Sequence, residues 1–169
     1  MITVMIAIDK LSLLLPIIFM IHNMEEYLFY EKFSNCFALI KPKCNNSKRS
    51  FGWAIVLLSV LTILIIGTDY FIANKITTFL KIITAVAIFV NAIQHVTYTV
   101  FFRKILPGTI TSIFLIIPYS VTFIITIKKE LMITYKEFLL YGMLSIIITR
   151  IVIITSLKIG NWLSNKVVS

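Results

Sequence analysis

Three ionisable side chains fall within five residues of a largely apolar stretch near the start of the chain. His22, Glu25 and Glu26 occupy positions i, i+3 and i+4, so on a helix they share one face. A histidine and a carboxylate one turn apart can bind the same divalent cation, and a neighbouring carboxylate can serve as a general base. We therefore predict that His22 and Glu26 bind a metal and that Glu25 is a free catalytic base. The alternative is that this stretch lies at a membrane surface, where both glutamates are simply solvated.

The second of the two histidines, His95, belongs to a polar stripe in another apolar stretch. Asn91, Gln94, His95, Tyr98 and Thr99 have helical spacing and lie on one face. We expect His95 to be the third metal ligand, and Asn91, Gln94 and Tyr98 to line the substrate site. A lone membrane histidine that only hydrogen-bonds two helices together is the competing interpretation.

Two histidines and one carboxylate are a ligand set for zinc in hydrolases and for non-haem iron. Membrane oxidases with two iron ions need many more histidines than two. The favoured hypothesis is a metal-dependent intramembrane enzyme, a hydrolase or another lipid-modifying enzyme, with zinc or iron as cofactor and a hydrophobic or lipid-like substrate. Two alternatives use the same residues: a metal-free acid–base lipid isomerase, and a proton- or ion-coupled carrier.

Three further residues are candidates for the same site. Arg150 lies about twelve residues into the last apolar stretch and needs an anionic partner there, either Glu25, Glu26 or a substrate; it is predicted to be catalytic or a structural counter-ion. Arg103 could bind a lipid phosphate or simply anchor the chain at the interface. Tyr119, beside a proline that should bend its helix, could line the pocket.

The elements that position these residues are membrane-spanning helices. Of the 169 residues, 59% are hydrophobic and only 14% are charged, which leaves too much apolar surface for a soluble fold. About 20 apolar residues cross a bilayer as a helix, and five such stretches occur. The sequence predicts an all-α, polytopic transmembrane helical bundle forming one domain over 1–169, with spans at about 11–30, 53–72, 78–102, 109–127 and 138–157.

Positive charge sets the predicted orientation in the cell membrane. The long basic loop from Glu31 to Gly52 should be cytoplasmic, which places the N-terminus outside and the C-terminus inside, with nine Lys and Arg inside against six outside if Lys81 is counted with its loop. The net charge of +9 thus reflects basic loops beside membrane spans and lipid contact, with no nucleic-acid motif. Cys36 and Cys44, both in that loop, are interpreted as ordinary thiols.

Taken together, the motifs resemble the HXXEE family of bacterial membrane proteins. The resemblance is carried by HNMEE at 22–26, the stretch from Asn91 to His95, Arg103, and PGT at 107–109, and it extends to about Pro118. The family pattern has a tyrosine two residues before Pro-Gly, where this chain has Ile105. The resemblance implies a membrane protein with a His/Glu/Glu/His site and supplies no reaction.

Overall fold

Every regular element in the described part of the chain is helical. The computed structural model describes residues 2–31, 47–130 and 134–166; Cys36, Cys44 and most of the basic loop lie outside these ranges. The elements, in chain order, are α1 (Ile2–Leu28), α3 (Lys48–Ile72), α4 (Lys75–Phe102), α5 (Thr109–Thr111), the π-helix η1 (Ser112–Ile116), α6 (Ile117–Glu130) and α7 (Tyr135–Lys166).

Five of the described helical segments are long and apolar enough to cross a membrane, as the sequence predicted. They are Leu11–Leu28 within α1, all of α3, all of α4, the continuous segment Thr109–Lys129 and all of α7. Each has 18 residues or more, which matches the length that a hydrocarbon core requires. The prediction of an all-α membrane bundle is therefore confirmed.

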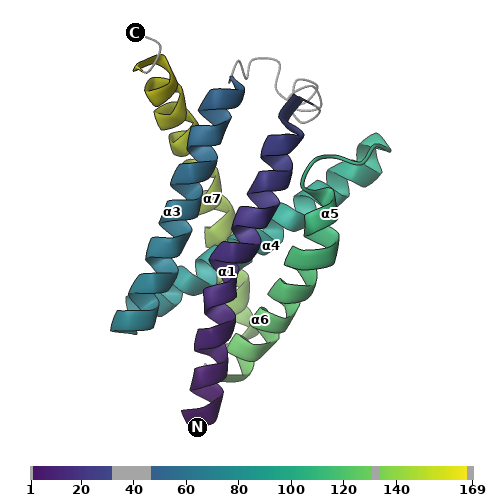
Figure 1. Cartoon of the computed structure of the whole chain (residues 1–169). Coiled ribbons are helices and arrows are strands. Elements are labelled where there is room, and N and C mark those ends of the chain that lie inside the picture. The colour runs from purple at the N-terminus through teal and green to yellow at the C-terminus, as the bar shows by residue number, and fades with distance from the viewer. Residues whose placement is uncertain (1, 32–46, 131–133, 167–169) are drawn as a thin grey trace.

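The helix α4 lies at the centre of the arrangement. It crosses obliquely behind α1 and packs against α3, α6 and α7, while α1 packs against α3, α6 and η1 (Figure 1). The buried apolar core forms between α1, α4 and α6, with Leu15, Ala92, Ile116 and Phe123 fully enclosed. The start of α1 and the end of α7 lie at opposite ends of the bundle (Figure 1), as an odd number of crossings requires.

The helices α3 and α7 approach closely because small residues face each other. Gly160 lies directly on the backbone of Ser50 and beside Ala54, so no side chain fits there. Such close approach through small residues is typical of helix pairs in membranes, where apolar side chains gain little by leaving lipid.

A buried ion pair ties the end of α3 to the beginning of α4. Lys81 contacts the carboxylate of Asp69, which also accepts a hydrogen bond from Thr78 Oγ1 at 3.1 Å. Counting Lys81 with the solvated loop was therefore wrong, because it lies inside α4 with its charge neutralised by a partner in α3.

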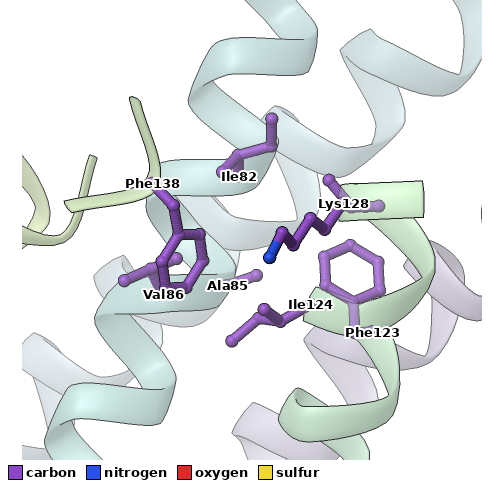
Figure 2. Close-up of a pocket in the computed structure, with 8 residues that line it drawn as sticks. Ile82, Ala85, Val86, Phe123, Ile124, Lys128 and Phe138 are labelled. Atoms are coloured by element: carbon purple, nitrogen blue, oxygen red, sulfur yellow. The ribbon is translucent and has the colours of Figure 1, made fainter. Parts of the chain in front are cut away.

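The fourth span is widened before its proline. Pro118 has no N–H to donate to the preceding turn, and the π-helix η1 ends at Ile116, two residues before it. Further along this span, α6 forms a small apolar crevice with α4 and the start of α7 (Figure 2), lined by residues that include Val86, Phe123 and Phe138. Val86 and His95 are nine residues apart on α4, about 14 Å along the helix axis, so this crevice is separate from the histidines.

Candidate metal centre

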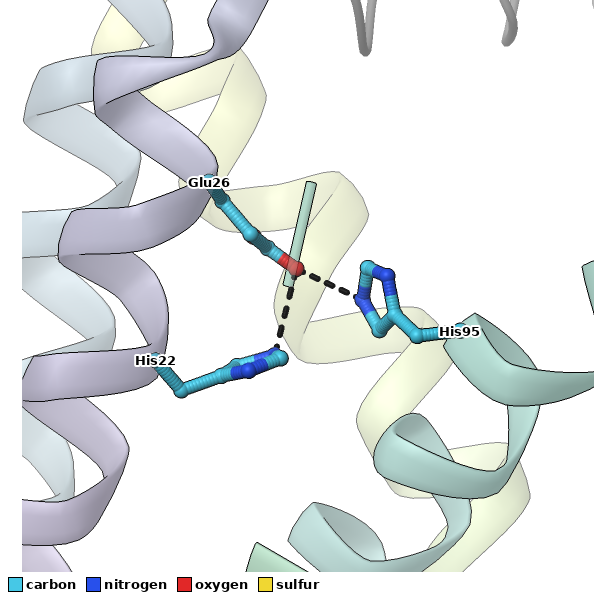
Figure 3. Close-up of side chains that lie close together, drawn as sticks. All are labelled: His22, Glu26 and His95. Atoms are coloured by element: carbon cyan, nitrogen blue, oxygen red, sulfur yellow. Dashed lines mark ion pairs between the residues drawn. The ribbon is translucent and has the colours of Figure 1, made fainter. Parts of the chain in front are cut away.

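Two helices bring the histidines and one glutamate together. His22 and Glu26 are one turn apart on α1, and His95 approaches from α4 (Figure 3). Glu26 Oε1 lies 3.3 Å from His22 Nε2 and 2.6 Å from His95 Nε2. The imidazole rings meet edge to face, with centroids 5.0 Å apart. The structure therefore places these three predicted ligands in mutual reach.

This group is buried and its donor atoms are close enough to share one cation. The exposed fractions are 0% for His22, 8% for Glu26 and 6% for His95. One ligand atom from each residue lies within 4.8 Å of the others. Buried polar groups of this kind require partners, so the arrangement is specified by the fold and is not an incidental surface cluster.

Hydrogen bonds hold both ring nitrogens of His22. Thr111 Oγ1 lies 2.9 Å from His22 Nδ1, and the same hydroxyl donates to the carbonyl of Gly108 at 3.3 Å. Asn91 Nδ2 lies 3.1 Å from His22 Nε2, and Glu26 Oε1 lies 3.3 Å from the same nitrogen. The imidazole nitrogen and the carboxylate oxygen that face one another are both atoms that bind divalent cations.

Glu25 has a different role from the one predicted. Its Oε1 accepts a hydrogen bond from the Gly108 backbone N–H and its Oε2 from that of Thr111, both at 2.9 Å. Successive residues of a helix point about 100° apart, so Glu26 faces His95 while Glu25 faces the start of α5. The carboxylate thus caps the fourth span, where backbone N–H groups lack helical partners. Glu25 is not a free base in this structure.

Thr109 follows the N-cap residue of the fourth span. That N-cap residue is Gly108, and the side-chain acceptor for its N–H is Glu25 of α1. Thr109 is the first residue of the helix, and its hydroxyl shares a 2.6 Å hydrogen bond with that of Thr99. Thr99 Oγ1 also accepts from the N–H of Leu106 at 3.2 Å. These bonds fold the segment between α4 and α5 back against α4.

Gly108 closes the site from that side. Its φ of +83° lies in the left-handed region, and a Cβ there would lie 2.8 Å from His22 Cε1 and 3.0 Å from His95 Cε1. The backbone of Gly108 therefore packs against both imidazoles, which only a glycine permits. The preceding Leu106 and Pro107 are buried as well. Irregular backbone at this depth is tolerated because protein encloses it.

The other predicted residues are distributed around the bundle. Asn91 joins the site through His22, whereas Gln94 is exposed and Tyr98 half-buried. Arg103 is exposed in the left-handed position that ends α4. Tyr119 donates to the carbonyl of Leu11 at 2.7 Å, within the core cluster.

Arg150 also lies away from these residues. It is exposed on α7, and among the described residues no acidic side chain forms an ion pair with it. The predicted convergence of Arg150 with Glu25 or Glu26 is therefore wrong. The prediction rested on equal depth along parallel helices, which does not determine the direction in which each side chain points.

Thr111 is the site residue that sequence reasoning missed. It stands three positions after Gly108, which is the spacing at which a capping group reaches a second backbone N–H. Its position three residues after Gly108 could have identified Thr111 from the sequence as part of the cap.

The comparison with protein families matches residues 13–123 to the model for a protein of unknown function with an HXXEE motif. The chain belongs to this HXXEE family. The matched segment contains α4, α5 and η1, together with the motif itself at residues 22–26. No curated protein and no solved structure matches the chain significantly. The structure gives the two motif glutamates separate partners: the second contacts both histidines and the first caps the fourth span.

Proposed function

We propose that this chain is a metal-dependent intramembrane enzyme, a hydrolase or another lipid-modifying enzyme, in which His22, Glu26 and His95 bind one divalent ion. The observation that carries the proposal is the buried meeting of three atoms that can bind a metal: Glu26 Oε1 lies 3.3 Å from His22 Nε2 and 2.6 Å from His95 Nε2. Two imidazoles and one carboxylate suit zinc or iron and leave coordination positions for a substrate.

The bound ion would supply Lewis acidity, which polarises a carbonyl or phosphoryl oxygen and favours hydrolysis. The chain's own groups hold and orient the ligands. Thr111 fixes the ring of His22 through Nδ1, as outer hydrogen bonds commonly do for ligating histidines. Asn91 would have to release Nε2 when an ion binds there, which frees its amide to donate to a substrate oxygen.

The surroundings of the motif favour a lipid-like substrate. Ile21, Met24 and Leu28 are all exposed and apolar, and they flank the site residues along α1. In a bilayer these side chains contact acyl chains at the depth of the histidines. A lipid could therefore approach laterally.

The orientation proposed from the sequence gains support from Lys81. Lys81 is buried against Asp69, so it no longer counts among the basic residues of the outside loops. Nine Lys and Arg then lie in the cytoplasmic loops and tails, compared with five outside. We propose the cell membrane as location, with the N-terminus outside and the histidines nearer the cytoplasmic face.

Mass spectrometry of lipids tests the enzymatic proposal. Protein reconstituted in phosphatidylethanolamine and phosphatidylglycerol vesicles is stripped with a chelator and reloaded with Zn²⁺ or Fe²⁺. We expect a lipid product that appears only with metal and is lost in His95→Ala, while Gln94→Ala, which changes an exposed neighbour on α4, retains it. Lipids left unchanged by the metal-loaded protein would contradict the proposal.

A metal-free function is the second candidate, because one observation favours it. Glu26 Oε1 lies between both imidazoles and only 2.6 Å from His95 Nε2, so a proton can pass along the three groups without an ion. Lipid isomerisation that survives chelation would identify this chemistry. Proton flux into vesicles, measured with a pH-sensitive dye and lost in Glu26→Gln, would identify a carrier.

A further inference from the structure

Arg150 carries a charge, and within residues 2–31, 47–130 and 134–166 no ion-pair partner reaches it. It lies on α7 eight residues before Lys158 and fifteen after Tyr135, which places it about 12 Å and about 22 Å from these residues along the helix axis. The side chain is exposed on the bundle surface, which faces lipid in a membrane. An arginine at that depth on a lipid-facing surface is costly and usually marks an interaction.

The remaining acidic side chains of the chain are already engaged or lie elsewhere. Four of those that the structure describes have partners already named or close by in sequence: Glu25 contacts backbone N–H groups, Glu26 both histidines, Asp69 Lys81, and Glu137 Thr134. Glu31, just after α1, also has an interaction partner. Asp9 lies in the first half of α1 and Glu130 is the last residue of α6. Among the acidic side chains that the structure describes, none is therefore available to pair with Arg150.

The two faces of α7 differ in composition. The small residues Ser145, Ser156, Gly160 and Ser164 are buried, and Gly160 packs directly on α3. The opposite face carries Arg150 among large exposed apolar side chains, Met143, Ile147, Ile151 and Ile154. This outer face of α7 is therefore apolar, with one positive charge near its middle.

We propose that the outer face of α7 binds a membrane helix of a different protein that carries Asp or Glu within its apolar span, at the depth of Arg150. A second copy of this chain is disfavoured because parallel α7 helices would place one Arg150 beside the other. A lipid phosphate is disfavoured because Lys158, two turns nearer the interface, is the better placed cation. An acidic side chain at matching depth neutralises the charge without leaving the hydrocarbon region.

Energy transfer in vesicles tests this proposal. The reconstituted full chain carries a donor dye, and synthetic Leu-rich transmembrane peptides with an acceptor dye carry a central Asp, Leu or Lys. We expect the Asp peptide to bind the wild-type chain at least tenfold more tightly than the Leu peptide, and the Lys peptide to bind more weakly than either. Arg150→Leu should abolish the preference and Arg150→Lys should keep part of it.

Three results would overturn the proposal. Equal binding of the three peptides to the wild-type chain needs no variant and is decisive even if Arg150→Leu does not fold. Unchanged preference for the Asp peptide in Arg150→Leu would place the contact elsewhere. Loss of the preference when phosphatidylglycerol is added, but not when phosphatidylcholine is added, would assign Arg150 to an anionic lipid.

Discussion

Substituting Gly108 by alanine perturbs the candidate site through a single methyl group. The new Cβ would lie 2.8 Å from His22 Cε1, well inside the roughly 3.5–4.0 Å of an ordinary carbon contact. The His22 ring cannot move aside freely, because Thr111 holds Nδ1 at 2.9 Å and Asn91 holds Nε2 at 3.1 Å. The new Cβ would also lie 3.0 Å from His95 Cε1.

Two costs combine in Gly108→Ala. A residue with a Cβ at φ +83° is strained by about 1–2 kcal/mol, and overpacking adds about 1–3 kcal/mol. We expect the free energy of unfolding to fall by about 2–5 kcal/mol, with weakened metal binding. Gly67→Ala is the matched control, since nothing lies within 4 Å of its Cβ in mid-α3, and it should be neutral or stabilising by up to about 1 kcal/mol.

The assay is thermal unfolding of both variants in detergent micelles, followed by circular dichroism, together with metal titration. Gly108→Ala should unfold at the lower temperature and Gly67→Ala at or above that of the wild type. If the two variants unfold at the same temperature, the backbone of Gly108 does not pack against the two imidazoles as described.

Three further substitutions separate the structural contacts from the proposed metal ligands. Glu25→Gln should lower the free energy of unfolding by about 2–3 kcal/mol, because an amide cannot accept both backbone N–H groups; equal stability to the wild type would remove its role as a cap. Lys81→Met should destabilise the protein by about 3–5 kcal/mol by leaving Asp69 buried without its cation, and adding Asp69→Asn should recover part of this loss in denaturant unfolding. Tyr119→Phe should lower the free energy of unfolding by only about 0.5–1.5 kcal/mol, because it removes the hydrogen bond to Leu11, and should leave metal affinity unchanged. A tenfold loss of metal affinity would instead show that Tyr119 contributes to the site.

Much of the architecture could be predicted because the bilayer restricts it. Stretches of about 20 apolar residues have few alternatives to membrane-spanning helices, and the predicted spans correspond to α1, α3, α4, the segment from α5 to α6, and α7. The meeting of His22, Glu26 and His95 could also be anticipated, since burying any one of them in lipid without a polar partner is costly.

The remaining differences arise from side-chain direction and from chain reversal. Helical periodicity predicts that Glu25 and Glu26 point in directions about 100° apart. It does not predict that the segment after α4 folds back and brings Gly108 and Thr111 to Glu25. Depth alone placed Arg150 level with the histidines, whereas only the packing of α7 shows that it faces outward. Both errors concern contacts between segments distant in sequence.

Titration of the chelator-stripped protein with Co²⁺, followed by visible absorption, tests the central claim most directly. We predict one ion per chain with the absorption of an imidazole- and carboxylate-ligated site, affinity reduced at least a hundredfold in His22→Ala and His95→Ala, and no change in Gln94→Ala. Absence of stoichiometric binding, or the same binding in His95→Ala as in the wild type, would show that these three side chains do not form a metal centre.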